Sequence, residues 1–300
     1  MDMTQNKCCR HGASLRRRRR RRRKILCFII FSCSIIAVAV FVAVGSSMIR
    51  SGDGRTNRYD VEARNNTYDN AVIENSKISE KNKIQKNQSM LDDIMNSTQY
   101  PKQLKDLALK NEEALEFVYD YPAEHVKEHT IDLTEEASMD SVPLFVQWDK
   151  RWGYEKYSGN FFAASGCGPT TLSMVVVYLT HNREASPIAV AKYSKEAGYS
   201  VDGSGSSWTL ISEGCMHYGV KAKAVALDES RMKAELDEGH PIVVNVGPGD
   251  FTDTGHFMVI TGYDDEGFSI NDPNSIEKSG KRWLFKNISS QIRAVWSMYV

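Results

Sequence analysis

Residues 165–180 read SGCGPTTLSMVVVYLT, and this stretch decides how the fold is interpreted. Its apolar run predicts a buried helix over 168–180, with Pro169 in the first turn. Cys167 comes directly before that helix, and the glycines on either side allow a close approach of backbone and substrate. A thiol at a helix start faces unpaired N–H groups and the positive end of the helix dipole, which favour the thiolate. The stretch therefore predicts a nucleophilic cysteine, and a small buried residue in a turn is the alternative.

The segments that follow change from mainly helical to mainly strand patterns. Ser186 and Pro187 begin a predicted helix that ends near Gly198. Further helices are expected over 208–219 and 229–239, and strands over 221–227, 242–247, 256–263, 268–272 and 292–300. Because most helices precede most strands, we expect an α+β fold with a helical half followed by an antiparallel sheet. This order argues against a parallel doubly wound sheet.

Two polar residues of the strand-rich half are placed where they can act as catalytic partners of the Cys167 thiol. His256 begins an apolar strand after the loop GPGDFTDTG, so its ring can face a cleft and act as a general base. If strands 256–263 and 268–272 pair through the turn DDEG, Asp272 returns to the level of His256 and can orient the imidazole. Asn271 points to the opposite face of an alternating strand and ranks lower. A satisfied core histidine and an Asp-Pro turn residue are the alternatives.

The remaining cysteine and the other acidic residues of the domain are expected to have structural roles and not to form a second site. Cys215 lies on an expected helix, where a core position is favoured over a metal ligand in Cys-x-His. The acidic residues of 250–266 fit no calcium-binding loop. Trp208 is expected in the core, whereas Trp148 and Trp152 suit a peptide groove and the core equally. We therefore expect neither a metal nor a cofactor.

The net charge of zero, from 38 basic and 38 acidic residues, conceals a strong segregation of charge. Residues 1–24 hold 11 basic residues and one acidic residue, so the rest of the chain has a net charge of −10. Phosphate recognition needs basic residues spread over a folded surface, and the acidic body does not offer them. Nucleic acid is therefore not an expected partner.

Residues 25–44, ILCFIIFSCSIIAVAVFVAV, form a run of 20 residues without a charge. A helix of this length crosses the roughly 30 Å hydrocarbon layer of a bilayer. The basic run before it predicts a cytoplasmic polybasic tail over 1–24, a transmembrane helix over 25–44 and an extracellular remainder at the cell membrane. A cleaved signal peptide and a nuclear-import or nucleic-acid patch are the alternatives.

Between the predicted span and the domain lie two further segments. Residues 45–97 are rich in Asn, Ser, Lys and Asp and predict a flexible or loosely helical stalk. Residues 98–141 form an accessory helical segment, since apolar residues recur at helical spacing over 100–119 and Pro122 lies beyond the expected helix end. This amphipathic helix needs a surface to pack on, and we expect the domain at 142–300 to provide it.

Four segments in fixed order carry a resemblance to a known family. VPLFVQWDKRWGYEKY is followed by SGCGPTT, GHFMVITGYD and NDP, and together they resemble the C39-like cysteine peptidases, with their papain-like α+β fold, over residues 142–300. The resemblance implies Cys167 as the nucleophile, His256 as the base, Asp272 as the orienting carboxylate and Gln147 as the oxyanion-hole glutamine. Bacteriocin-exporting members cleave leader peptides and are fused to ATP-driven transporters. This sequence has no phosphate-binding loop, so their substrate is not carried over.

From these residues we expect a membrane-anchored extracellular cysteine peptidase that hydrolyses peptide bonds of a peptide or protein substrate. Two alternatives remain. The same acyl-enzyme can act on cell-wall peptides as an amidase, or be resolved by an amine, which makes the protein a transpeptidase. The domain can also be a non-catalytic surface module that binds peptides without cleaving them.

Overall fold

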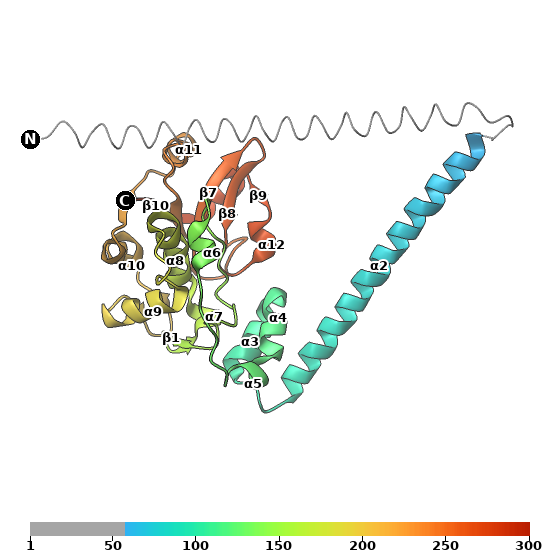
Figure 1. Ribbon diagram of the computed structural model, residues 1–300, viewed down its shortest axis with the longest axis horizontal. Coiled ribbons are helices and arrows are strands. Elements are labelled where there is room, and N and C mark those ends of the chain that lie inside the picture. Colours follow the sequence, from blue (N-terminus) through green and yellow to red (C-terminus); the bar gives the residue numbers. More distant parts are fainter. Residues whose placement is uncertain (1–57) are drawn as a thin grey trace, which may run out of the picture. The chain divides into compact units, whose positions relative to one another are not determined.

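The structure is a computed structural model that describes residues 58–300, with side chains described from residue 77 onward (Figure 1). The predicted tail and transmembrane segment, residues 1–44, lie outside this part. Within the described part, no helix combines the length and the apolar content needed to cross a membrane. Contacts divide the chain after Glu80 into two units, and the second, Lys81–Val300, contains the whole predicted domain.

Helix α2 (Arg58–Asn96) occupies most of the segment that we predict as a stalk. Its side chains from residue 77 are mostly exposed until the last turns, where Met90 and Ile94 become buried. These two residues join an apolar cluster with Leu104 and Phe117, which belong to the helices that follow. The end of α2 is therefore packed into the second unit through hydrophobic burial.

The single helix expected over 100–119 is divided into shorter elements. Helix α3 (Lys102–Lys110) is followed by the 3₁₀ turn η2 (Glu112–Ala114), α4 (Leu115–Tyr119) and α5 (Tyr121–Glu124). The prediction was wrong because Asn111 is extended, with φ −134° and ψ 100°, and its side chain accepts the backbone N–H of Glu113. Pro122, expected beyond the helix end, lies in the first turn of α5.

The centre of the domain is a six-stranded sheet in the order β5-β10-β6-β7-β8-β9, with every neighbouring pair antiparallel. Its strands are β5 (Lys221–Ala224), β6 (Ile242–Val246), β7 (His256–Asp264), β8 (Gly267–Asn271), β9 (Arg282–Trp283) and β10 (Ile292–Tyr299). Two short ribbons precede it, β1 (Lys156–Tyr157) with β2 (Asn160–Phe161), and β3 (Ser200–Val201) with β4 (Gly205–Ser206). The expected α+β class with an antiparallel sheet is confirmed.

Helices cover both faces of the sheet and complete three layers. One face packs on α8 (Cys167–Thr180) and α9 (Pro187–Glu196), and its cluster includes Val243 and Phe257 of the sheet. The other face packs on α11 (Glu229–Asp237) and α13 (Phe285–Ile288), and includes Val244 and Met258. Neighbouring residues of one strand thus face opposite layers, as strand geometry requires. In Figure 1, α8 lies beside β7, with which it makes extensive contacts.

The helix expected over 208–219 is divided at Glu213 into α10 (Thr209–Ser212) and the 3₁₀ turn η3 (Gly214–Tyr218). Cys215 is fully buried, as expected for a core residue. Trp208 was expected in the core, but it is 47% exposed. It directly precedes α10, and its ring meets Trp296 edge-on with centroids 6.0 Å apart, which leaves its other side to solvent. Trp152, by contrast, is a buried anchor.

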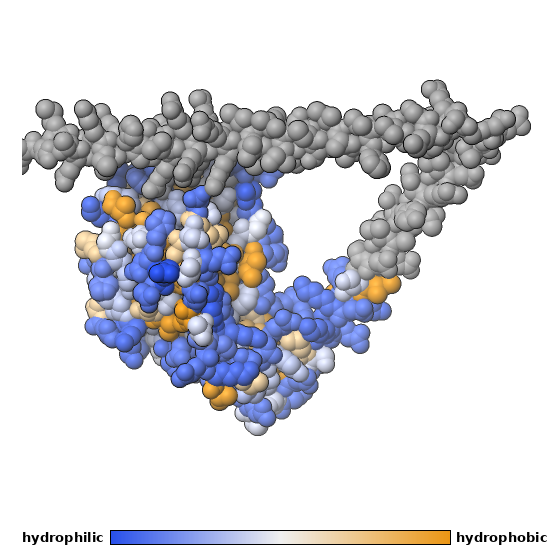
Figure 2. Space-filling view, viewed as in Figure 1, coloured by the Kyte–Doolittle hydropathy of each residue, from blue (hydrophilic) through white to orange (hydrophobic). Residues whose placement is uncertain are grey.

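The remaining short helices are α6 (Thr134–Ser138), α7 (Phe162–Ser165), α12 (Ile276–Ser279) and η4 (Ser289–Gln291). On the face of the molecule drawn in Figure 2, hydrophilic residues cover most of the domain and hydrophobic residues form small separate groups. Scattered apolar residues of this kind are ordinary for a soluble surface. This face offers no broad apolar area.

Candidate active site

Cys167 is the first residue of α8 and is a free cysteine, and the residue as a whole is partly exposed. The flanking glycines were expected to admit substrate, but protein groups occupy the space beside them. A Cβ atom on Gly166 would lie 2.6 Å from the ring of Phe162, and one on Gly168 would lie 2.6 Å from Oγ of Ser206. The two glycines therefore let the start of α8 pack closely against its neighbours, which fixes the position of the thiol.

His256 and Asp272 meet through the hairpin of β7 and β8. His256 is the first residue of β7, and Asp272 follows the last residue of β8. The strands pair antiparallel, so Asp272 returns toward the start of β7 as the sequence pattern predicts. Nε2 of His256 lies 2.7 Å from Oδ1 of Asp272, and both residues are buried.

The thiol of Cys167 and the imidazole of His256 interact, and this interaction changes the pKa of both groups. Burial raises the pKa of Cys167, but the hydrogen bond and charge of His256, with the backbone N–H groups of Phe257 and Gly168, outweigh it and lower the pKa. Burial lowers the pKa of His256, but the charge and hydrogen bond of Asp272, and then Cys167, raise it above its usual range. Both shifts favour a thiolate beside an imidazolium.

A strap formed by residues 142–147 supports the turn that carries Asp272. Nδ2 of Asn271 donates to the carbonyl oxygens of Val142 and Pro143, at 3.1 and 3.0 Å. The backbone N–H of Gln147 donates to the carbonyl of Pro273 at 2.7 Å. The side-chain amide of Asn271 is therefore occupied by the strap.

Gln147 itself is 4% exposed and lies at the cleft that contains Cys167. Its Nε2 donates to the carbonyl oxygen of Ala163 at 2.7 Å, four residues before the thiol. Its Oε1 is buried and accepts no hydrogen bond from the described residues. One Nε2 hydrogen is engaged by Ala163, so the other is left for a further acceptor.

The cleft at Cys167 has a volume of about 510 Å³ and two walls of different origin. One wall is α3 and the residue that follows it, and the other is the loop of residues 249–255. Most of the lining is polar: Gln103, Asp106, Lys110, Asn111, Gln147, Asn160, Asp250, Thr252, Asp253, Thr254, Asn274 and Lys278. Asp250 and Asp253, two of the acidic residues that fit no calcium-binding loop, line this cleft. The contribution of α3 was not predicted, because nothing in its own pattern indicates what it packs on.

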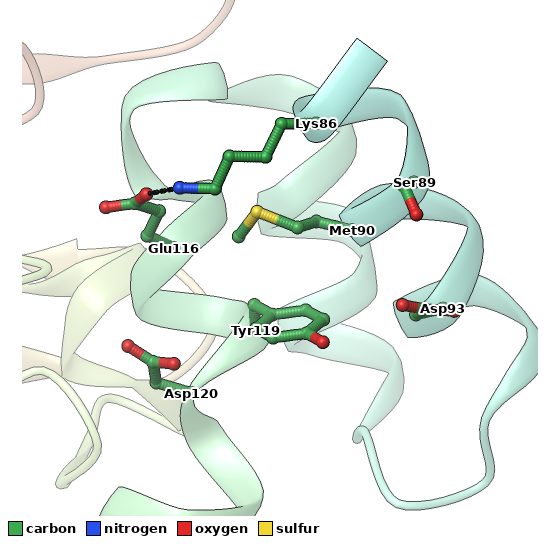
Figure 3. Close-up of a pocket in the computed structure, with 7 residues that line it drawn as sticks. All are labelled: Lys86, Ser89, Met90, Asp93, Glu116, Tyr119 and Asp120. Atoms are coloured by element: carbon green, nitrogen blue, oxygen red, sulfur yellow. Dashed lines mark hydrogen bonds and ion pairs between the residues drawn. The ribbon is translucent and has the colours of Figure 1, made fainter. Parts of the chain in front are cut away.

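A second cavity of about 480 Å³ lies between α2 and α4 (Figure 3). Its lining is Lys86, Ser89, Met90, Asp93, Glu116, Tyr119 and Asp120. Lys86 donates to Glu116 at 2.6 Å across it, and Asp120 accepts from Lys150 at 2.6 Å. Within the part of the chain that the structure describes, no group of three His, Cys, Asp or Glu side chains is placed to hold a metal ion.

Solved structures that are similar to the chain include two with 18% sequence identity each. The peptidase domain of Streptococcus ComA, a bifunctional ABC transporter involved in quorum sensing, has a TM-score of 0.39; 53% of this chain and 96% of that one are covered. A putative C39-like peptidase from Bacillus anthracis has a TM-score of 0.33; 53% of this chain and 95% of that one are covered.

No curated protein matches the sequence. The family model described as the Peptidase C39 like family matches residues 139–300, more than half of the chain and all of the region that holds Cys167, His256 and Asp272. The chain belongs to the Peptidase C39 like family.

Proposed function

We propose that the domain is a cysteine peptidase with Cys167 as nucleophile, His256 as general base and acid, and Asp272 as the carboxylate that orients the imidazole. One observation carries the proposal. His256 interacts with the thiol of Cys167 and lies 2.7 Å from the carboxylate of Asp272, and Cys167 lines a cleft of about 510 Å³. A pure binding module has no need for a thiol with a lowered pKa at this position.

The chemistry follows from the order of the three groups. The thiolate attacks the carbonyl carbon of a peptide bond, and the oxyanion is received by Nε2–H of Gln147 and by a backbone N–H at the start of α8. The imidazolium of His256 then gives its proton to the leaving amine as the C–N bond breaks. Water, deprotonated by His256, attacks the thioester and releases the carboxylate product and the free thiol.

The substrate that suits the cleft is an extended, polar peptide segment. Such a segment would lie between α3 and loop 249–255, where side chains of both charges, including Lys110 and Asp253, line the walls. The polar lining favours hydrogen bonding to a peptide backbone over an apolar ligand. The family relationship supports the same substrate class.

We also place this peptidase outside the cell membrane, on a single N-terminal anchor. The supporting features are the uncharged run of residues 25–44 and the basic run directly before it. Alkaline extraction of membranes should leave the full-length protein in the pellet, and an externally added protease should remove the domain from intact cells. Release of the full-length protein by alkali contradicts the anchor.

The enzymatic proposal is tested with a peptide library analysed by mass spectrometry. The wild-type protein should produce cleaved peptides, and Cys167→Ala should produce none. New carboxyl termini indicate hydrolysis, whereas products joined to an added amine indicate a transpeptidase. Activity that survives in Cys167→Ala, or persistent peptide binding without turnover in the wild type, contradicts the proposal.

A further inference from the structure

The break in the helical pattern at Asn111 brings a distant segment onto the turn after β8. Nδ2 of Asn111 donates to the carbonyl oxygen of Asn274 at 2.9 Å and to its Oδ1 at 3.0 Å. Oδ1 of Asn111 accepts the backbone N–H of Glu113 at 3.0 Å. A helix that continued through Asn111 would not have this cap. The same residue therefore ends α3, begins η2 and binds the turn 163 residues later in the sequence.

Glu113 makes a second set of contacts on that turn. Its Oε2 accepts the backbone N–H groups of Ile276 and Glu277, at 2.7 and 3.0 Å. Its Oε1 accepts the hydroxyl of Ser275. These two N–H groups open α12 and have no partner within that helix, so the carboxylate satisfies them and also meets the positive end of the peptide dipoles. Hydrogen bonds to a charged acceptor are the stronger kind.

The bound turn carries the carboxylate of the proposed site. The backbone N–H of Asn274 donates to Oδ1 of Asp272 at 2.8 Å, the same oxygen that His256 contacts. The hydroxyl of Ser279 in α12 accepts the backbone N–H of Asp272 at 2.9 Å. The contacts thus run without interruption from Asn111 and Glu113, through residues 274–279, to Asp272.

We propose that Asn111 and Glu113 are positioning residues that hold the Asp272 carboxylate within hydrogen-bond distance of His256. We call these two residues the clamp. The inference rests on the proposed role of Asp272. Both residues lie outside the region 139–300 that matches the family model, so the segment we describe as accessory is part of the catalytic unit. Neither side chain touches the thiol or the imidazole among the contacts described. They act through the turn that they bind.

The geometry sets the size of the expected effect. Oδ1 of Asp272 accepts at 2.7 Å from His256, so a shift of the turn by a fraction of an ångström weakens the contact that holds the imidazolium. Misplacing a catalytic group by about 1 Å costs on the order of 10²-fold in rate. Glu113 does not line the cleft, so its loss should lower kcat by about tenfold and leave KM nearly unchanged, since peptide binding is not altered.

The first test needs no peptide substrate. Rates of Cys167 alkylation by iodoacetamide are measured against pH for the wild type, Glu113→Gln, Asn111→Ser and the control Glu112→Gln. Glu112 is the neighbouring exposed carboxylate, which accepts from Asn87 rather than from the turn. A displaced Asp272 carboxylate stabilises the imidazolium of His256 less, and the thiolate of Cys167 is then stabilised less as well. The pH midpoint of the alkylation profile should therefore rise by about half a pH unit in both clamp variants. The control should match the wild type.

The second test compares the clamp with its target. Glu113→Gln is combined with Asp272→Asn, and kcat and KM are measured on one cleaved peptide. A residue that acts through Asp272 has no further effect once that carboxylate is gone, so the double variant should equal Asp272→Asn alone. An additive loss means that Glu113 acts elsewhere and overturns the proposal.

The outcomes separate this proposal from the peptidase proposal. Alkylation profiles of Glu113→Gln and Asn111→Ser that coincide with the control overturn the clamp, whatever the peptidase result. A shifted profile in a protein that cleaves no peptide supports the clamp and contradicts the peptidase. Asn111→Ser keeps a hydroxyl that can cap η2 while it is too short to reach Asn274, so it gives a second folded variant if Glu113→Gln unfolds.

Discussion

Nε2 of His256 lies 2.7 Å from Oδ1 of Asp272, and the two side chains are 7% and 0% exposed. A contact this short between two buried ionisable groups fixes which ring nitrogen faces the carboxylate, and it leaves Nδ1 for the thiol of Cys167. Oδ2 of Asp272 accepts no hydrogen bond from the described residues. Among the described residues, the carboxylate is thus held through Oδ1 alone. The position of Oδ1 therefore determines how closely the carboxylate contacts the imidazole.

Asp272→Asn should lower kcat by on the order of 10²- to 10⁴-fold, because an amide neither stabilises the imidazolium nor imposes the same ring orientation. Steady-state kinetics on a cleaved peptide measure the effect. Asp264→Asn is a suitable control, because Asp264 lies at the exposed end of the hairpin and pairs with Arg282. Equal losses in the two variants contradict an orienting role for Asp272.

Alkylation of Cys167 should remain fast well below the usual titration range of a free thiol. The lowered pKa of Cys167 keeps the thiolate until the pH falls through that value. The raised pKa of His256 keeps the imidazolium until the pH rises through that higher value, after which its stabilising charge is lost. Iodoacetamide rates against pH test both limits, and His256→Ala should move the lower limit upward. A wild-type profile centred near pH 8.5, the value of an unperturbed thiol, contradicts the ion pair.

Gln147→Ala should separate transition-state stabilisation from thiol reactivity. Loss of one donor to the oxyanion lowers kcat by about 10²-fold or more. Alkylation by iodoacetamide forms no oxyanion, so its rate should stay within about twofold of the wild type. Parallel losses in both measurements would instead assign Gln147 to the structure of the strap, through its contact with Ala163.

Gly168→Ala should destabilise the domain by about 1–3 kcal/mol, because the added methyl group meets Ser206 at 2.6 Å. Ser206→Gly removes the obstructing atoms, so the double variant should recover most of the loss. Urea unfolding followed by fluorescence measures the free energy of unfolding. Gly262→Ala is the matched control, since a Cβ atom there meets nothing within 4 Å. Ser206→Gly alone is measured as well, because it loses the hydrogen bond to Tyr157; losses that simply add in the double variant exclude this clash as the cause.

The site was predictable from sequence where its geometry is local. A hairpin between β7 and β8 needs only alternating strands and a short turn, and it brings Asp272 back to His256. The buried helix after Cys167 follows in the same way from an apolar run with a proline in its first turn. The α+β class follows from the order of the elements.

The remainder depends on contacts between distant segments. Residues 100–119 have an unbroken helical pattern. The helix ends at Asn111 because this residue is extended and its side chain binds Glu113 and Asn274. Trp208 has the large apolar side chain typical of a core residue, but its position before α10 leaves one side of the ring exposed. Such outcomes are set by tertiary packing, which overrides local propensity.

Strand β10 occupies an interior place in the sheet, between β5 and β6, although it follows every other described strand in the chain. Until the residues of β10, up to Tyr299, have left the ribosome, β5 has no partner strand and β6 has no partner on the side that β10 will occupy. Chains emerge at about 5–20 residues per second, and domains fold as units once they are complete. The six-stranded sheet therefore cannot close until its last strand in the chain, β10, has been synthesised, and β5 waits for β10 although it comes first of the six in sequence.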